Sequence, residues 1–159
     1  MTLNSIGLDS KMTKEIAQDL NGLLANFQIY YLYLRGIHWN ILGKRFFVLH
    51  VMFVELYTDA NMKVVLIAER ILTLGVTPLH TFEAYSELAR VHIGKNVSND
   101  EKAVRLIVDS ISELLKIERA ILNKSSDAND EGTNAMMSDF IAEQEKTVWM
   151  MKAWLNESV

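Results

Sequence analysis

The chain has 159 residues, half of them hydrophobic, with seven glycines, one proline and no cysteine. That is enough for one domain with a substantial core, and so few turn-forming residues argue against a β-sandwich or barrel, which turns about every ten residues. With 16 Lys and Arg against 20 Asp and Glu, the net charge is -4, so net basicity gives no reason to propose nucleic-acid binding.

No apolar run approaches the roughly 20 residues that a membrane helix needs. The first residues lack the basic start and apolar stretch of a secretory signal, and a chain without cysteine has no disulfide framework. We therefore expect a single domain over residues 1–159, a cytoplasmic location and no membrane contact.

The N-terminal half carries two segments with apolar side chains at steps of three or four residues, the spacing of a helix with one buried face. The first segment is predicted to run from about Ser10 to Trp39. Gly43, four residues later, breaks the pattern. The second carries His50 near its start and ends at Gly75, with Pro78 three residues further on.

The C-terminal half has two more segments of this kind. The third is predicted to begin with a capping box from Ser98 to Glu101, and its apolar stripe includes Glu118. The fourth follows the acidic stretch 125–132, which suits the start of a helix, and its stripe includes Gln144.

The links between these segments predict the topology. The first and second segments, like the third and fourth, are joined by short links and should be antiparallel, whereas 22 residues from Val76 to Val97 separate the second from the third. A link of this length lets the second and third helices run parallel, as in ferritin-like four-helix bundles with one long crossover. Residues 81–88 within the link are predicted to form a short extra helix.

The motifs that would place chemistry within one chain are absent. No glutamate is followed by a histidine three positions later, which excludes the Glu-x-x-His pattern of di-iron bundles. The sequence also lacks His-Glu-x-x-His, thiolate zinc ligands and the glycine-rich loops that hold phosphates. A di-iron site inside a single bundle is therefore not expected.

Two histidines, twelve positions apart, stand where the stripes predict apolar side chains: His38 and His50. Glu69 lies along the same face as His50 but four to five turns away, so only a second, antiparallel copy of this helix would bring the two together. Each histidine alone is more simply a hydrogen-bonded core residue, and Glu69 beside Arg70 is more simply part of an ion pair.

Three acids near the start of the fourth segment also have two interpretations. Asp127, Asp130 and Glu131 are most simply a solvated loop and helix cap, and the less favoured interpretation is an ion-attracting pore.

The chain resembles the Dps family, the mini-ferritins named DNA-binding proteins from starved cells, over essentially its whole length. The residues that carry the resemblance are His38-Trp39-Asn40-Ile41-Leu42-Gly43-Lys44-Arg45-Phe46-Phe47-Val48-Leu49-His50, Phe53, Leu56-Tyr57, Ala68-Glu69-Arg70, Leu74-Gly75 and Thr77-Pro78-Leu79. The resemblance implies a dodecameric cage of identical subunits. Such a cage takes up Fe(II), oxidises it with hydrogen peroxide or oxygen as a ferroxidase, stores the ferric mineral and limits oxidative stress.

The resemblance also implies where the metal ligands lie, between two subunits. The family's histidines fall on His38 and His50 of one subunit and its glutamate on Glu69 of the other. At the family's two aspartate positions this chain has Val54 and Val65 instead. Because iron needs anionic oxygen ligands, the two valines predict a reduced or lost ferroxidase centre, in which two imidazoles and one carboxylate hold a single Fe(II) or Zn(II).

Three functions follow from these features. The first is an iron-sequestering mini-ferritin that still binds metal at His38, His50 and Glu69. The second is a non-catalytic shell protein whose groove is closed by Val54 and Val65, alone or co-assembled with an intact homologue. The third, a nucleoid-coating protein, is disfavoured because the first ten residues contain no Lys or Arg, so we expect weak or no DNA binding.

Overall fold

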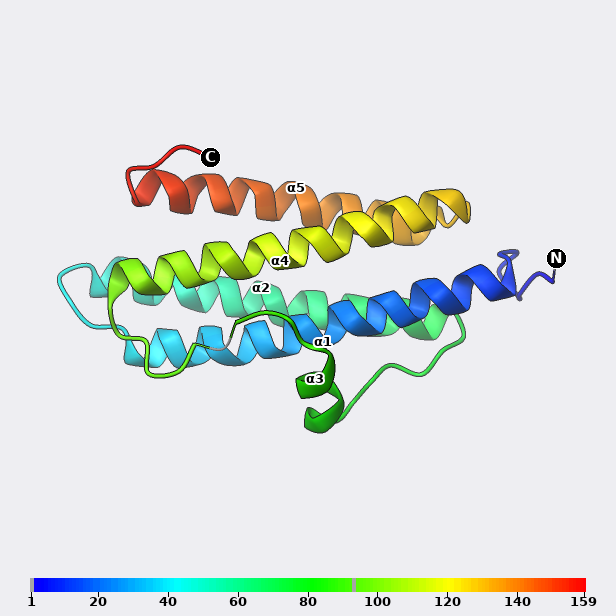
Figure 1. The fold of residues 1–159 in the computed structure, drawn as a ribbon, viewed down its shortest axis with the longest axis horizontal. Coiled ribbons are helices and arrows are strands. Elements are labelled where there is room, and N and C mark those ends of the chain that lie inside the picture. The colour runs from blue at the N-terminus through cyan, green and yellow to red at the C-terminus, as the bar shows by residue number, and fades with distance from the viewer. Residues whose placement is uncertain (1, 93) are drawn as a thin grey trace.

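The computed structural model describes residues 2–92 and 94–159 as five helices. Their bounds are α1 Ser10–Asn40, α2 Phe46–Thr73, α3 Phe82–Leu88, α4 Asp100–Asp127 and α5 Glu131–Trp154. The four long helices form the bundle, and the short α3 lies outside it against α1 (Figure 1). The predicted ferritin-like bundle with a short extra helix in the crossover is thereby confirmed.

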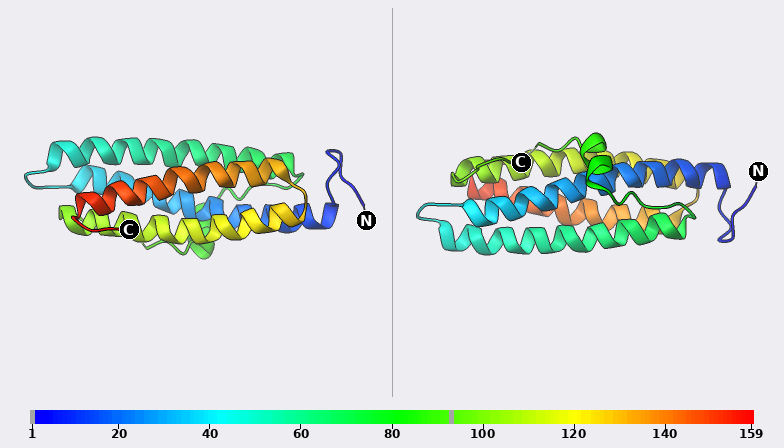
Figure 2. Two further views of the ribbon diagram at one scale, coloured as in Figure 1. Left: turned by 90° about the horizontal axis from the view of Figure 1, so that it is seen from above. Right: turned by 90° about the horizontal axis from the view of Figure 1, so that it is seen from below.

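The direction of each helix also follows the prediction. α1 and α5 run one way along the bundle, whereas α2 and α4 run the other way, so the second and third long helices are parallel (Figure 1). The crossover between them returns the chain along the side of α1, as the right-hand view of Figure 2 shows. No helix in the described part of the chain is long and apolar enough to cross a membrane.

Polar side chains fix where the helices begin. Asp9 accepts hydrogen bonds from the first turn of α1, and Thr81 does the same for α3. The predicted cap at Ser98 is wrong by one position, because Asn99 supplies the capping oxygen to the Lys102 amide at 2.9 Å. Asparagine is as good a cap as serine, so the sequence around α4 allowed both registers.

Two buried asparagines on α1 hold the crossover in place. Asn21 accepts a hydrogen bond from the Leu79 amide at 2.8 Å, and Asn26 accepts from the amides of Arg90 and Val91 at 2.7 and 3.1 Å. Each of these side-chain oxygens satisfies backbone donors that no regular element would satisfy. These hydrogen bonds therefore hold the long link against α1 at Leu79 and at Arg90 and Val91.

Candidate metal centre

The two histidines predicted as ligands meet at one end of the bundle. His38 lies in the last turns of α1 and His50 in the first turns of α2, and the short link 41–45 folds the two helices back on each other. Their rings stack with centroids 3.7 Å apart and planes 18° from parallel. The structure thus brings together residues that the sequence places twelve positions apart.

Reciprocal hydrogen bonds fix the orientation of both rings. His38 Nδ1 lies 2.7 Å from the carbonyl oxygen of His50, and His50 Nδ1 lies 2.8 Å from the carbonyl oxygen of His38. A carbonyl only accepts, so each Nδ1 carries the hydrogen, and in the neutral ring Nε2 then holds the free lone pair. Both imidazoles can therefore bind a metal through Nε2. Each is oriented by a backbone carbonyl, as metal-binding histidines commonly are.

Aromatic rings enclose the histidine pair. Phe46 stacks on His50 with centroids 4.8 Å apart, and Tyr57 meets His38 edge to face at 5.4 Å. Both histidines are half-buried, so the rings are held by packing as well as by their hydrogen bonds. Little rotamer freedom is left to lose on binding a ligand.

The third predicted ligand is far from this pair within one chain. Glu69 follows His50 by nineteen residues on α2, which separates them by about 28 Å along the helix axis. Within residues 2–92 and 94–159, no three His, Asp or Glu side chains gather closely enough to hold a metal ion. A site that includes Glu69 therefore needs a second subunit.

Val54 and Val65 lie between those two positions on α2. Val54 is half-buried and Val65 is 48% exposed. Other large apolar side chains on this face of α2, Phe47, Val51, Met62 and Leu72, are more than half exposed. Exposed apolar side chains grouped on one helix face are a common feature of interaction surfaces.

An ion pair between Glu69 and its neighbour Arg70 does not form within the described chain, and an ion pair of Glu69 with another subunit stays a prediction. Arg70 Nη2 instead donates to Asp130 Oδ1 at 2.5 Å, and Arg70 Nε donates to Thr133 at 2.9 Å. The guanidinium lies so close to Gly132 that a Cβ at that position would stand 2.7 Å from it. This contact fastens the end of α2 to the start of α5.

The three acids proposed as pore residues differ in their surroundings. Asp127 and Glu131 are exposed and remain candidates. The Asp130 side chain is fully buried, and it caps α5 by accepting from the Thr133 amide at 3.0 Å while it pairs with Arg70. Asp130 thus departs from the pore expectation and fits the helix-cap interpretation, because its carboxylate is already used within the fold.

A polar cluster in the middle of the bundle was not predicted. Lys63 of α2 is buried and bonded to Asp59 and Glu143, and Glu118 of α4 is buried beside Gln144 of α5. The signal was present, because Glu118 and Gln144 both interrupt otherwise apolar stripes. Lys63, between Met62 and Val64, gave no comparable signal.

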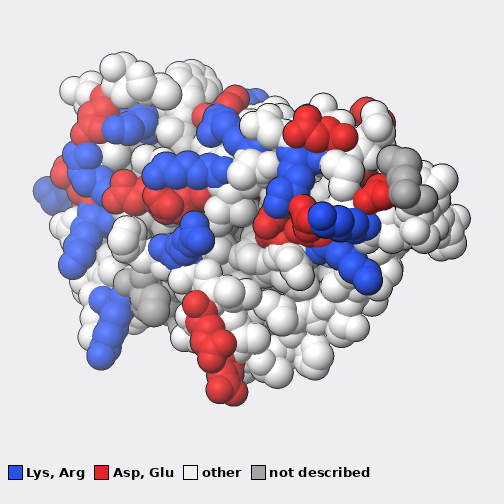
Figure 3. Space-filling view, turned by 45° about the vertical axis from the view of Figure 1, so that its right-hand side comes forward, with Lys and Arg blue, Asp and Glu red and all other residues white. Residues whose placement is uncertain are grey.

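Charge on the surface is mixed. On the face shown in Figure 3, Lys and Arg side chains alternate with Asp and Glu, and no large basic patch is visible. At the N-terminus, Asn4 accepts hydrogen bonds from the amides of Ile6 and Leu8, which folds this segment into a compact hook before α1. The described N-terminal segment thus lacks the form and charge of an extended basic arm.

Comparisons with known proteins agree with the fold. The ferritin-like domain family matches residues 17–158. A crystal structure described as a Dps protein from Vibrio cholerae O1, a member of a broad superfamily of ferritin-like diiron-carboxylate proteins, is 46% identical. It covers 98% of both chains with a TM-score of 0.95.

Two further relatives are informative. The DNA protection during starvation protein of Porphyromonas gingivalis is 38% identical over 152 residues, 96% of each chain. A structure of a Listeria innocua Dps mutant, in which two histidines twelve positions apart are changed to glycine, is 25% identical. It covers 90% of this chain and 95% of that one with a TM-score of 0.87. Because the four-helix bundle, the long crossover and these relatives all agree, the chain belongs to the Dps family of the ferritin-like superfamily.

Proposed function

We propose that this protein is a Dps-type mini-ferritin, a cage of twelve copies that takes up Fe(II) and limits peroxide stress. Each site binds one metal ion through His38 and His50 of one subunit together with Glu69 of the partner subunit. The observation that carries the proposal is the stacked histidine pair, in which each Nδ1 donates to a backbone carbonyl and each Nε2 keeps a free lone pair for a metal ion. The relative from Porphyromonas gingivalis is named for DNA protection, and we do not propose that activity for this protein.

The geometry of α2 supports the shared site. In the antiparallel arrangement that we propose, His50 faces Glu69 of the partner subunit, and the same register sets Val54 opposite Val65 of the partner subunit. The first residue of α2, Phe46, then stands opposite the last, Thr73 of the partner subunit, so the two helices overlap along their whole length. This register covers the exposed apolar face of α2 completely.

The paired valines set the chemistry of the proposed site. Two imidazoles and one carboxylate are enough to hold a single Fe(II) or Zn(II) ion. A pair of irons, and the ferric product above all, needs more anionic oxygen, which two valines do not supply. We therefore expect metal binding with slow oxidation, compared with a site that has aspartates at both positions.

A non-catalytic shell protein is the second candidate, and the valines are also the observation that favours it. In the proposed register, Val54 and Val65 pack against each other and exclude water from the groove between subunits. The shell then forms through this apolar contact and holds no metal at the histidines. Co-assembly with a homologue that keeps both aspartates would give such a shell a ferroxidase partner.

Metal stoichiometry distinguishes these functions. Anaerobic titration of the assembled protein with Fe(II), and with Co(II) as a spectroscopic probe, is expected to show one tight site per chain, which His50→Ala abolishes. The double variant Val54→Asp/Val65→Asp is expected to bind two ions per chain and to oxidise Fe(II) faster with peroxide or oxygen. Val48→Asp is the matched control, because it adds a carboxylate to α2 at an exposed position outside the histidine site.

The results distinguish the metal-binding mini-ferritin from the non-catalytic shell protein. Equal and fast oxidation by the parent and the double variant refutes the role of the valines. A parent that binds no metal, with an active double variant, identifies a shell protein with a lapsed ferroxidase centre. If neither protein binds or oxidises metal, the proposed contact between subunits is wrong.

DNA binding is proposed to be weak or absent at physiological salt. The chain is acidic overall, and Lys11 and Lys14 are too few for appreciable phosphate neutralisation near the N-terminus. A gel shift of a long duplex by submicromolar cage would overturn this proposal.

A further inference from the structure

The middle of the bundle holds an acid that no surface water reaches. Glu118 of α4 is 0% exposed, and its nearest polar neighbour is Gln144 of α5, which is also buried. Burying an ionised carboxylate without a partner is costly, so such a group either finds a counter-charge or holds a proton.

The orientation of the Gln144 amide is fixed by its acceptors. Gln144 Nε2 donates to Glu118 Oε1 at 2.6 Å and to the Phe140 carbonyl oxygen at 3.0 Å. A flipped amide would put its oxygen against the Phe140 carbonyl oxygen, which only accepts, so the nitrogen belongs in this position. Gln144 Oε1 and Glu118 Oε2 are then both buried and have no hydrogen-bond partner.

Lys63, the buried cation nearest to this pair, is already engaged. Its ammonium group has three donors, and it bonds Asp59 Oδ1 at 2.8 Å, Asp59 Oδ2 at 2.6 Å and Glu143 Oε2 at 2.7 Å. Arg119 of α4 also acts on Glu118 by charge, but it pairs with Glu145 at the surface. Neither cation forms a hydrogen bond to Glu118.

The remaining neighbour from α1 is Tyr30. Its side chain is buried in the core near Glu118 and Asp59, and burial is the main cause that raises the pKa of Tyr30 well above its usual value. Tyr30 is therefore neutral and supplies no positive charge. Of the groups that face Glu118 from the four long helices, none offers it a counter-charge at hydrogen-bond distance.

We propose that Glu118 carries a proton in the native protein and donates it from Oε2 to Gln144 Oε1. The carboxyl group and the amide then form a closed pair with two hydrogen bonds, and both unpartnered atoms are satisfied by each other. Burial also raises the pKa of Glu118 to about 8, in agreement with a neutral acid. The pair joins α4 to α5 in the core and makes this joint sensitive to alkaline pH.

The alternative is an ionised Glu118 with a buried water molecule that donates to both unpartnered oxygens. The two states differ in the protonation of one carboxyl group. Infrared spectroscopy distinguishes them directly, because the C=O stretch of a carboxylic acid lies above the carboxylate and amide bands. At pH 7 the exposed acids are ionised and do not contribute to this band.

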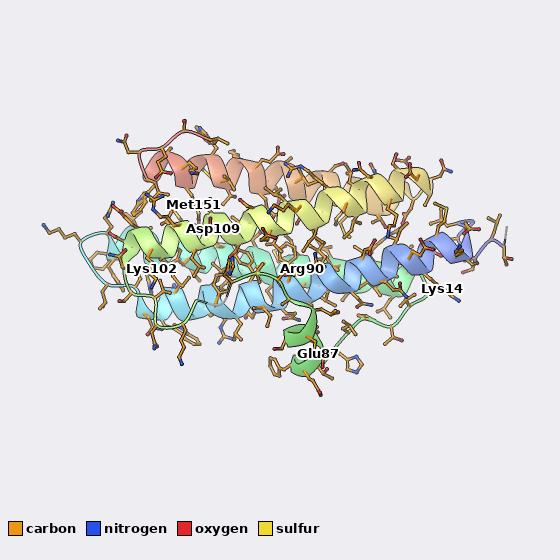
Figure 4. All side chains as sticks on the ribbon, viewed as in Figure 1. Lys14, Glu87, Arg90, Lys102, Asp109 and Met151 are labelled. Atoms are coloured by element: carbon orange, nitrogen blue, oxygen red, sulfur yellow. The ribbon has the colours of Figure 1, made fainter. Side chains whose placement is uncertain are left out.

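The test compares the assembled parent with Glu118→Gln at pH 7, in H2O and in D2O. The parent is expected to show one carboxylic-acid band that shifts in D2O and disappears above pH 9. Glu118→Gln is expected to lack the band and still to assemble, because an amide at position 118 can also exchange two hydrogen bonds with Gln144. Glu87→Gln is the matched control, since Glu87 is exposed on α3 outside the bundle (Figure 4), and this variant should keep the band.

Absence of the band from the parent at pH 7 overturns the proposal, as does a band that persists in Glu118→Gln. Should Glu118→Gln fail to assemble, the pH titration of the parent decides by itself. A band that is present at pH 7 and lost at higher pH supports a neutral core acid, whereas absence of any such band at pH 7 refutes it.

Discussion

Replacing Asp130 with alanine is expected to be among the most destabilising single substitutions outside the apolar core. The Asp130 side chain is 0% exposed and that of Arg70 is 19% exposed, so the substitution leaves a mostly buried guanidinium without its carboxylate. The same substitution removes the cap of α5, because Asp130 accepts from both the amide and the hydroxyl of Thr133. One carboxylate thus joins α2 to α5 and begins a helix.

The expected loss follows from these two roles. Breaking a buried ion pair from one side costs about 3–5 kcal/mol, and the partial exposure of Arg70 favours the lower end of this range. Loss of a helix cap costs about 1 kcal/mol more. A total of about 4 kcal/mol lowers the melting temperature of a chain of this length by roughly 10 °C.

The assay is thermal and urea unfolding of the assembled protein at one fixed concentration, because assembly contributes to the measured stability. Asp127→Ala is the matched control, since Asp127 is exposed three residues earlier, and it should change stability by no more than about 0.5 kcal/mol. Asp130→Asn keeps a capping oxygen but loses the charge, and it is expected to fall between the two. An Asp130→Ala protein within about 1 kcal/mol of Asp127→Ala would refute the reasoning.

Three further outcomes are expected. Gly132→Ala should lower the free energy of unfolding by about 1–3 kcal/mol in urea. A Cβ there would stand 2.7 Å from the Arg70 guanidinium, which hydrogen bonds to Asp130 and Thr133 hold in place. An unchanged midpoint would show that the arginine moves freely. Asn26→Ala should speed amide hydrogen exchange at Arg90 and in the crossover around it, since two amides lose their acceptor, while exchange in α5 stays constant. Because burial raises the pKa of Glu118 from 4.5 to about 8, the folded state holds a proton that the unfolded chain releases, and its stability falls as the pH rises through this range. Relative to the parent, Glu118→Gln should therefore gain roughly 3–4 kcal/mol between pH 5 and pH 8 in urea unfolding, and a constant difference would contradict a raised pKa.

Much of the fold could be predicted from local patterns. The three-to-four spacing predicted four long helices, and the single long link predicted the parallel pair α2 and α4. The start of α1 was predicted correctly because apolar spacing and cap agree there. At α4 the adjacent Ser98 and Asn99 are both good caps, and only the folded backbone shows that Asn99 is the one used.

The candidate site was predictable only in part. Resemblance to the Dps family indicated His38 and His50, and the structure shows them stacked, with hydrogen bonds that no spacing rule predicts. The contribution of Glu69 stays a prediction, because that side chain lies far from the histidines in its own chain. Asp130 was ambiguous in the sequence, since an acid before a helix can cap it, face a pore or pair with a distant arginine.

Periodicity, link length and residue identity are local properties, so the sequence was enough to predict the helices and the crossover and to show valine at positions 54 and 65. The tertiary structure alone decided which polar groups meet across helices. Arg70 with Asp130, and Glu118 with Gln144, are each brought together from more than twenty residues apart. Their protonation and energetic weight depend on burial and on nearby donors, which arise only when the four helices pack.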